Sequence, residues 1–434
     1  MSAFSVFHSD LLNETYHFFR HPSGLKIFVF PKKMTTTYAL LATDFGSVDR
    51  IGSDGKKYPA GVAHFLEHKL FSNEDGSDSF EKFSALGADA NAYTAATRTV
   101  YLFSATERVE EALTELIRFV THPYFTEESV ARERGIIGEE IRQTGDNPYN
   151  RAYYQMLRGL YEAHPVKDEI CGSLTSIEEI TPEVLYDAYH TYYTPANLTL
   201  VVCGDVAPET VREIAEREVP LSPGVPRPPR EIVPECDAAR VRVAKNRGQL
   251  AKPVFCIGMK DNGYRLSATE RTKRDAGMGV LSEMLFSQSG ELFNELFGRG
   301  EIGADFSADY ALTEGFSYLR LFGEADDPER VFEKILAYFE EKRKNGFSRE
   351  EFERCRRVEY AEYIKGFDST EEIAETLLCF ALEGAEIFEY ADAVREIDFE
   401  YVENLFREAF LPERFTLSAV YPEEEKEEEK WAQL

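Results

Sequence analysis

The chain has 434 residues, too many for one ordinary core, so two or more domains are expected. Hydrophobic residues make up 43% of the sequence and include 32 Phe and 23 Tyr, which argues against disorder. The 49 basic and 78 acidic residues give a net charge of −29, a sign that repels nucleic-acid phosphates and anionic lipid headgroups. We therefore expect no nucleic-acid partner and no membrane partner.

The sequence predicts a cytoplasmic location. The first residues contain no basic stretch followed by an apolar run, and no uninterrupted run of about 18 apolar residues occurs, so neither a secretory signal nor a membrane span is expected. The six cysteines are widely spaced and form no Cys-x-x-Cys pair, which is typical of free thiols in a reducing compartment.

A segment rich in Pro and Gly lies near the midpoint of the chain. Pro or Gly occupies most positions between Pro223 and Pro229, which favours an extended connector over a core element. We expect an N-terminal domain over residues 1–222, a linker over 223–232 and a C-terminal domain over 233–434.

Strands and helices alternate along the first half. The pattern predicts strands over residues 36–45, 88–94, 98–104 and 198–203, and helices over residues 62–71, 80–86, 107–120 and 126–157. Adjacent strands, a run of helices and a return strand predict an α+β sandwich, in which a largely antiparallel sheet carries helices on one face.

The second half repeats the order of motifs seen in the first. Gly87-Ala88-Asp89 precedes a strand-like segment and an acidic helix, and Gly303-Ala304-Asp305 does the same. A shared order at a spacing of about half the chain indicates a duplicated domain.

The segment from His64 to His68, with Glu67 between the two imidazoles, lies on a predicted helix. On a helix, His64 and His68 lie about 40° apart around the axis and Glu67 about 60° to the other side of His64, so all three project from one face. Two imidazoles at this spacing can hold one zinc ion, and the carboxylate can reach a water beside it. The motif is the inverted form of the H-E-x-x-H helix of zinc hydrolases. The alternative is a pair of structural histidines on an amphipathic helix.

The predicted helix after residue 126 offers candidates for a third ligand. Counted from Glu133, the side chain of Glu140 returns to within about 20° two turns later. Ile136 and Ile137 flank this stripe, whereas Glu139 points away from it. Carboxylates on a buried stripe need a cation or donors, which a zinc ion for Glu140 and an imidazole N–H for Glu133 would supply. The alternative is a tilted helix whose two carboxylates both reach solvent.

These residues together resemble the pitrilysin/insulinase family of zinc peptidases, which includes mitochondrial processing peptidase. The motif from His64 to His68 is followed about 70 residues later by Glu133 and Glu140, as in that family. Two further segments are similar to the family's active-site edge strand (Asn91-Ala92-Tyr93-Thr94) and to its domain-closing segment (residues 192–205). Within the family, the chain resembles the zinc-bearing subunit of a bacterial paired peptidase associated with elongation factor P modification.

The resemblance implies two homologous α+β domains that enclose a chamber, with one Zn²⁺ in the first domain and an inactive second domain. It implies a zinc metalloendopeptidase that cleaves peptides or unfolded segments. The resemblance implies that His64, His68 and Glu140 are zinc ligands, that Glu67 is the general base and that Glu133 orients a ligand histidine. It implies substrate binding by strand addition for Asn91, Ala92, Tyr93 and Thr94.

The second half departs from the family pattern at one place. Active family members that work alone or as homodimers carry an Arg and, seven residues later, a Tyr, but Phe297 and Ala304 occupy these positions. Arg299 is nearby, yet the residue seven positions after it is Phe306. We therefore expect a related insulinase-family subunit to supply the Arg/Tyr pair in a heterodimer, with a homodimer as the other possible assembly.

Two other functions stay open at this point. The chain could be a zinc-binding but proteolytically weak subunit with a structural or peptide-binding role in a heteromeric complex, because the Arg/Tyr pair is missing. It could also be a metal-free α/β binding protein whose histidines match the motif by coincidence.

Overall fold

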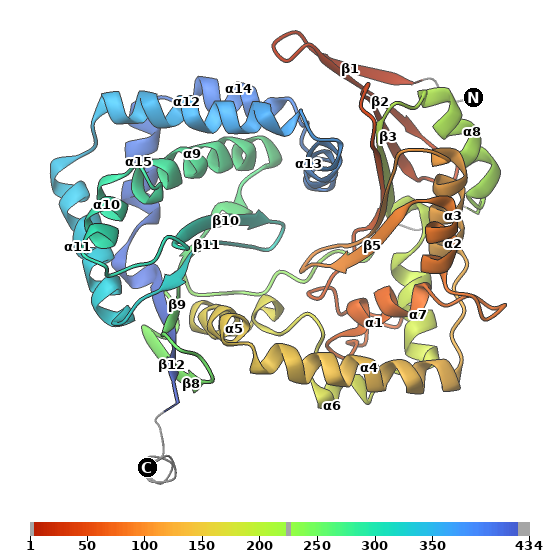
Figure 1. Cartoon of the computed structure of the whole chain (residues 1–434), viewed down its shortest axis with the longest axis horizontal. Coiled ribbons are helices and arrows are strands. Elements are labelled where there is room, and N and C mark those ends of the chain that lie inside the picture. The colour runs from red at the N-terminus through yellow and green to blue at the C-terminus, as the bar shows by residue number, and fades with distance from the viewer. Residues whose placement is uncertain (1–3, 223–226, 424–434) are drawn as a thin grey trace, which may run out of the picture. The chain divides into compact units, whose positions relative to one another are not determined.

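The structure, a computed structural model, describes residues 4–222 and 227–423 (Figure 1). The chain divides into two compact units. The first unit comprises the described residues of Met1–Ile141, Asp168–Ile232 and Ala361–Ala391, and the second those of Arg142–Lys167, Val233–Tyr360 and Asp392–Leu434. Each unit therefore includes a segment from the other half of the sequence. The domain boundaries predicted at the linker stay a prediction.

The first unit is built on a seven-stranded sheet in the order β1-β2-β3-β7-β4-β6-β5. Its strands are β1 (Ser5–Ser9), β2 (Glu14–Arg20), β3 (Lys26–Pro31), β4 (Thr37–Thr43), β5 (Asp89–Thr94), β6 (Thr99–Ala105) and β7 (Leu198–Gly204). All neighbours pair antiparallel except β3 and β7, which are parallel. Among the described residues, strand β5 pairs with β6 alone and so forms one edge of the sheet.

The second unit is built on a five-stranded sheet in the order β10-β11-β9-β12-β8. Its strands are β8 (Val243–Gly248), β9 (Val254–Asp261), β10 (Ser307–Thr313), β11 (Phe316–Glu324) and β12 (Phe415–Pro422). Its one parallel pair, β12 with β8, corresponds to β7 with β3, and the antiparallel pairs follow in the same sequence. The predicted α+β class with two similar domains is confirmed, and the shared strand order fits a duplication.

Fifteen α-helices connect and cover these strands in the described part of the chain. They are α1 (Val62–Leu70), α2 (Ser79–Leu86), α3 (Val109–Thr121), α4 (Glu127–Asp146), α5 (Pro148–Leu160), α6 (Leu174–Ile177), α7 (Pro182–Tyr192), α8 (Pro208–Glu218), α9 (Ala268–Phe286), α10 (Glu291–Gly298), α11 (Pro328–Asn345), α12 (Arg349–Gly366), α13 (Thr370–Glu383), α14 (Glu389–Glu396) and α15 (Phe399–Ala409).

Both faces of the first sheet are covered, although the sequence predicted helices on one face. Strand β4 is buried at every position. Ala39 and Leu41 face the core that contains α1, α3 and α7, whereas Tyr38 and Leu40 face a second core with Leu377 of α13. In the same way, α5 from the N-terminal half packs on β9 and β12 of the second unit. Each sheet is thus completed by a helix that comes from the other half of the sequence.

The helix predicted over residues 126–157 is two helices, so that prediction is wrong at Asn147. The Asn147 side chain accepts hydrogen bonds from the backbone N–H groups of Tyr149 (2.9 Å) and Asn150 (3.3 Å), and Pro148 occupies the first helical position of α5. Proline has no N–H for the helical ladder and its ring clashes with the preceding turn, so a new helix begins there.

Buried ion pairs hold both ends of the linker, whose residues 223–226 lie outside the described part of the chain. Arg230 of the first unit donates to Asp49 (2.9 Å) and Asp44 (2.5 Å). Glu235 of the second unit lies 2.9 Å from Lys260 and also accepts from three successive backbone N–H groups after α5. The described part of the linker is therefore anchored to a unit at each end.

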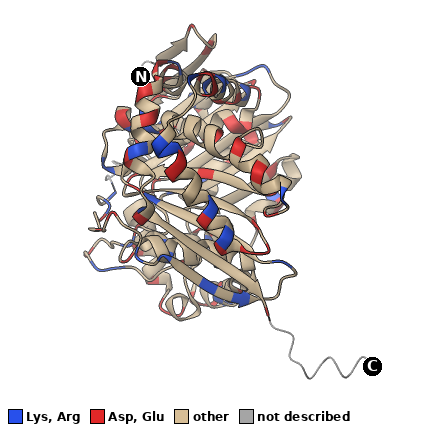
Figure 2. Cartoon of the chain, turned by 90° about the vertical axis from the view of Figure 1, so that its left-hand side faces the viewer, with Lys and Arg blue, Asp and Glu red and all other residues tan. Residues whose placement is uncertain are grey.

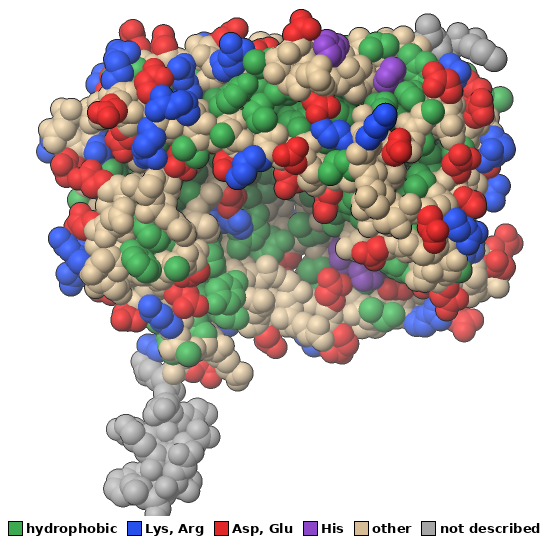
Figure 3. All heavy atoms as spheres, turned by 45° about the horizontal axis from the view of Figure 1, so that its top comes forward, with side chains coloured by type: hydrophobic (Ala, Val, Ile, Leu, Met, Phe, Trp, Pro, Cys, Tyr) green, Lys and Arg blue, Asp and Glu red, His purple; other side chains and the backbone are tan. Residues whose placement is uncertain are grey.

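In the described residues, no helix combines the length and the apolar character that crossing a bilayer requires. Ribbon segments of acidic and of basic residues are interspersed in the view of Figure 2. The face drawn as spheres in Figure 3 has the same mixture of charges. The acidic residues are thus distributed among basic ones in both views.

Candidate metal centre

Helix α1 carries the first two candidate ligands and is buried on nearly all sides. Its apolar residues, including Phe65 and Leu66, pack into the core of the first unit. Gly61 starts the helix with φ of 93°, a left-handed conformation that favours glycine. A Cβ at this position would lie 2.5 Å from the carbonyl oxygen of Cys171, so the chain passes too close for any other residue. Core packing and the close backbone contact at Gly61 therefore fix the position of the helix that carries the two imidazoles.

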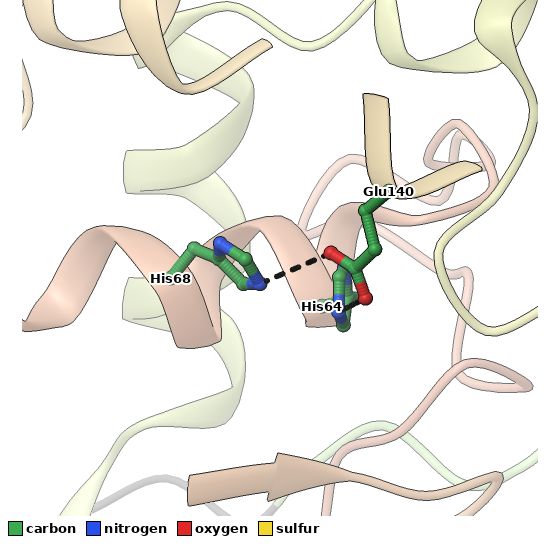
Figure 4. Close-up of side chains that lie close together, drawn as sticks. All are labelled: His64, His68 and Glu140. Atoms are coloured by element: carbon green, nitrogen blue, oxygen red, sulfur yellow. Dashed lines mark ion pairs between the residues drawn. The ribbon is translucent and has the colours of Figure 1, made fainter. Parts of the chain in front are cut away.

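His64, His68 and Glu140 converge as the sequence predicted (Figure 4). The Nε2 atoms of His64 and His68 each lie 3.5 Å from one carboxylate oxygen of Glu140, and the three ligand atoms lie within 4.8 Å of one another. Two ligands bound tetrahedrally to one zinc ion at about 2.0–2.1 Å are separated by about 3.3 Å. The spacing is therefore close to that of a metal site.

The chemistry of this donor set fits zinc. Two imidazoles and one carboxylate are a common ligand set of catalytic zinc sites, in which a fourth position is left for water or substrate. The hydrogen bond with His64, the principal cause, and the charges of both imidazoles lower the pKa of Glu140 despite partial burial. Among the residues that the structure describes, no other group of three or more His, Cys, Asp or Glu side chains has this metal-binding geometry.

Glu133 orients one of the two imidazoles. Its carboxylate lies 3.0 Å from Nδ1 of His68, and an ionised carboxylate can only accept, so Nδ1–H is the donor. This tautomer leaves the lone pair of Nε2 directed at the cluster. Burial alone would lower the pKa of His68, but the hydrogen bond to Glu133 and the carboxylates of Glu67 and Glu140 raise it. Burial likewise opposes ionisation of Glu133, whose pKa is nevertheless lowered by His68.

A fully buried lysine lies behind Glu133. The ammonium group of Lys69 lies 3.9 Å from the Glu133 carboxylate and donates to the hydroxyl of Ser72 at 3.2 Å. Sequence reasoning did not single out Lys69, although a lysine directly after the two histidines on a buried helix was visible. Its charge adds to the reasons why Glu133 stays ionised.

Glu67 lies on the same helix, and 9% of the residue's surface is exposed to solvent. Its Oε2 accepts a hydrogen bond of 2.5 Å from the hydroxyl of Thr94, the last residue of β5. The sequence predicted that Thr94 would bind substrate. That role stays a prediction, and the contact between the Thr94 side chain and Glu67 is an addition that the spacing of the two residues did not indicate.

The other predicted substrate-binding residues lie along edge strand β5. Asn91 is exposed, and Ala92 packs against the core of the first unit. The hydroxyl of Tyr93 donates to Glu375 of α13 at 2.6 Å, and that carboxylate also accepts from Tyr38 of β4 at 3.2 Å. The tyrosine therefore ties the edge strand to a helix that lies far away in the sequence.

On α4, the predicted stripe is confirmed in part. Glu133 and Ile137 are buried and Glu139 is exposed, as the rotation of the helix predicted. Ile136, expected to flank the stripe on its apolar side, is 52% exposed. The helix packs along a narrower face than expected, so only one of the two isoleucines reaches the core.

In the second unit, the positions of the missing Arg/Tyr pair fall at and after the end of α10. Phe297 is 47% exposed and stacks on Phe293. Arg299 pairs with Glu295 at 3.0 Å on the surface, and Phe306 is buried. None of these side chains reproduces a cationic group next to a tyrosine hydroxyl.

Comparison with known proteins matches both halves to family models. Residues 47–173 match the insulinase (peptidase family M16) model, and residues 179–359 match the peptidase M16 inactive domain. The uncharacterized zinc protease YmfH of Bacillus subtilis (strain 168) is 35% identical over 421 residues, which cover 95% of this chain and 98% of that protein.

Solved structures agree with this result. A crystal structure described as an M16-like peptidase from Alicyclobacillus acidocaldarius is 29% identical, with a TM-score of 0.89 over 97% of this chain and 99% of that chain. A protease from Helicobacter pylori, 18% identical, shares the fold with a TM-score of 0.84 over 94% of this chain and 100% of that chain.

Proposed function

The chain belongs to the insulinase family of peptidases (peptidase family M16), and on that basis we propose that it is a zinc-dependent metalloendopeptidase that cleaves peptides or unfolded segments. The observation that carries the proposal is the convergence of His64, His68 and Glu140 within 4.8 Å, with Glu67 on the same helix as the two imidazoles. One zinc ion per chain would occupy this cluster.

In this proposal, each residue of the site has a distinct role. His64, His68 and Glu140 hold the ion, and Glu133 keeps His68 in the tautomer whose Nε2 can bind. Bound zinc would polarise the peptide carbonyl and lower the pKa of a water molecule. Glu67 takes the proton of the attacking water and passes it to the leaving amine.

Substrate binding is proposed to use the edge of the first sheet. Strand β5 is paired on one side only, so its other side can add an extended peptide as a further strand through backbone hydrogen bonds. Asn91 and Ala92 lie in this strand, which ends at Thr94 beside Glu67. A peptide that pairs with β5 would thus run towards the proposed general base.

The proposal includes a partner subunit. The Arg/Tyr pair that family members working alone use has no counterpart at Phe297 and Ala304, and Arg299 is engaged in a surface ion pair. Groups that stabilise a developing oxyanion are worth about 3–4 kcal/mol each. A related insulinase-family subunit that carries both residues would restore this contribution in a heterodimer. A cytoplasmic location is also proposed, supported by the six cysteines, which form no disulfide in the described part of the chain.

The test combines metal analysis with a peptidase assay. Zinc content and cleavage of an internally quenched peptide are measured for the wild type and for Glu67→Gln, alone and with a candidate subunit that lacks the His motif but carries Arg and Tyr. We expect one zinc per chain in both proteins, and strong cleavage only by the wild type with its partner. Cleavage by Glu67→Gln would refute the general base, and strong cleavage by the chain alone would refute the split site.

A zinc-loaded complex that binds peptide but does not cleave it would instead support the second function, a structural or peptide-binding subunit. The missing Arg/Tyr pair is the observation that favours this alternative. Peptide binding is measured by fluorescence anisotropy with the same complex, so that the two functions give different results.

A further inference from the structure

We propose that Thr94 is the positioning residue for Glu67: its hydroxyl fixes the plane and the distance of the carboxylate relative to edge strand β5. The inference rests on the proposed function, because it assigns a role to a residue next to the proposed general base. It differs from the substrate-contacting role expected for Thr94 from the sequence.

The direction of the hydrogen bond follows from the chemistry of the two groups. An ionised carboxylate has no proton to donate, so Thr94 Oγ1–H is the donor and Oε2 of Glu67 the acceptor, at 2.5 Å. Hydrogen bonds to charged acceptors are shorter and about twice as strong as bonds between neutral groups. Glu67 is buried, so a lost donor would be poorly replaced by solvent.

The neighbouring hydroxyls have other partners within hydrogen-bond distance. The phenols of Tyr101 and Tyr193 hydrogen-bond to each other at 2.8 Å, which uses the proton of one of the two. Thr99 donates its only hydroxyl proton to the carbonyl of Phe45 at 2.9 Å, so its 3.4 Å approach to Thr94 supplies no proton for Glu67. Within the described part of the chain, the Thr94 hydroxyl is the sole hydrogen-bond donor to this carboxylate.

Because Thr94 belongs to edge strand β5, its hydrogen bond links Glu67 to that strand. Thr94 is the last residue of β5, and its backbone is fixed by pairing with Thr99 of β6. A hydrogen bond from this residue therefore fixes the position of the Glu67 carboxylate relative to the strand that would bind the peptide. It occupies Oε2 and leaves Oε1 for the proton of the attacking water. A displacement of about 1 Å in a reacting group can cost about a hundredfold in rate.

The experiment removes the hydroxyl while it keeps the shape of the side chain. Thr94→Val and Thr94→Ser are compared with the wild type in the zinc-loaded form that cleaves peptide, with its partner where one is required. We expect Thr94→Val to lower kcat by about 10- to 100-fold with KM changed less than about 3-fold. Thr94→Ser should stay within about 3-fold of the wild-type kcat, because it retains the donor. Zinc content should equal that of the wild type in both variants.

Thr99→Val is the matched control. It deletes a buried hydroxyl from the paired strand, one that points to Phe45 and not to Glu67, so kcat should change less than about 3-fold even if the melting temperature falls. Should Thr94→Val fail to fold, Thr94→Ala is judged by the same criteria. Crystal structures of the zinc-loaded proteins give a readout without substrate, in which Glu67 should keep its rotamer in Thr94→Ser and lose it in Thr94→Val.

Several results would overturn the proposal: a wild-type kcat in Thr94→Val, a loss confined to KM, or a loss that Thr94→Ser fails to restore. Glu67→Gln, assayed in parallel, separates this failure from failure of the proposed function. If Glu67→Gln is inactive while Thr94→Val is fully active, only the positioning role is wrong. If Glu67→Gln cleaves like the wild type, the general base is wrong and the positioning role falls with it.

Discussion

The sheets of the two units have the same order of corresponding strands, but the units differ at the helix that follows one of these strands. In the first unit, α1 follows β4 and presents His64, Glu67 and His68; in the second, α9 follows β9. Counted back from the phenylalanine at the end of each helix, the three positions are held in α9 by Gly279, Ser282 and Glu283. The same framework is thus present twice, and the three positions that carry the motif in the first unit hold other side chains in the second.

The corresponding space in the second unit is filled by protein groups. A Cβ on Gly279 would lie 2.7 Å from the carboxylate carbon of Glu359 on α12, so this carboxylate occupies the region beside the helix. Glu283 faces Arg354 of the same helix at 3.7 Å. The imidazoles of the first unit point at the carboxylate of Glu140. At the equivalent positions, the second unit has Gly279 and the ion pair of Glu283 with Arg354.

Buried charges are also balanced differently. In the second unit, Asp261 is paired with Arg274 at 2.5 Å, and Glu235 with Lys260 at 2.9 Å, so each carboxylate has a cationic side chain. At the candidate metal centre, Glu140 meets two imidazoles, which are neutral when they act as ligands. The first unit pairs Asp49 with Arg230 in the same way, so the difference lies at Glu140, whose charge two neutral imidazoles leave for a bound metal ion to balance. The comparison of the two units leads to the following predictions, in order of decreasing expected effect.

The largest effect is expected from removing one ligand. His64→Ala should lower bound zinc from one per chain to near zero and reduce peptide cleavage by more than about 10³-fold, because two remaining ligands hold the ion poorly. Metal content by plasma emission spectroscopy and the peptidase assay measure both effects. Glu283→Ala, at the equivalent place of His68 in the second unit, is the control and should retain one zinc. Zinc lost equally from both variants would contradict the comparison.

The starts of the two helices differ as well. Gly61 begins α1 in a left-handed conformation against a backbone carbonyl, whereas Ser267 begins α9 with a capping box to Glu270. Gly61→Ala combines a strained φ with a clash that no side-chain rotation relieves, and should lower the free energy of unfolding by about 4 kcal/mol. Ser267→Ala removes one cap and should cost about 1 kcal/mol. Urea unfolding followed by circular dichroism compares the two. Equal losses of unfolding free energy in the two variants would show that the close approach of Gly61 to the Cys171 carbonyl does not exclude a side chain.

The ion pair of Glu235 should make the second unit sensitive to acid. The hydrogen bonds to Lys260 and to three backbone N–H groups overcome burial and lower the pKa of Glu235 to about 2, from 4.5 for the free side chain. The unfolded chain then binds more protons than the folded one between these pH values, so this contribution is complete above about pH 5 and is lost as the pH falls towards 2. The expected contribution is about 3 kcal/mol.

This contribution is measured as the difference in unfolding free energy between the wild type and Glu235→Gln. The difference should be largest at neutral pH and should shrink steadily below pH 4.5, since protonated Glu235 resembles glutamine. A difference that stays constant down to the acid limit of folding would mean that folding does not lower the pKa of Glu235.

A smaller effect is expected from the residue that orients His68. Glu133→Gln keeps a hydrogen-bond acceptor for Nδ1–H but removes the charge, so zinc affinity should fall about 10- to 100-fold. Competition with a chelator of known affinity measures the change. Glu139→Gln, six residues along the same helix but exposed, is the control and should leave the affinity unchanged. Equal zinc affinities of the wild type, Glu133→Gln and Glu139→Gln would show that Glu133 does not contribute to zinc binding.

The motif on α1 and the stripe on α4 were predictable because helical rotation alone decides which side chains share a face. The same reasoning placed Glu133, Glu140 and Glu139 correctly. It could not find the bond between Thr94 and Glu67 or the one between Tyr93 and Glu375, because periodicity carries no information on which distant element packs against a face. For the same reason, α13 on the second face of the first sheet was not foreseen.

One error had a visible cause. Asn147 and Pro148 carry the pattern that caps one helix and starts the next, yet the apolar residues on both sides continued a helical pattern across them. The rigid backbone of proline outweighed that pattern. Local chemistry of this kind is readable from sequence, whereas long-range contacts need coordinates.

The smallest effect is expected at Arg299, the arginine nearest to the missing pair. Its ion pair with Glu295 spans one helical turn and more than half of its side chain is exposed, a setting worth about 0.5 kcal/mol or less. Arg299→Ala should therefore leave stability nearly unchanged, and it should alter kcat less than about 2-fold if a partner supplies the arginine. A loss of about 100-fold would instead mean that Arg299 leaves Glu295 to contact the substrate. The second unit would then take part in the chemistry through its own side chain, and the contrast between the two units would lie in the metal ligands alone.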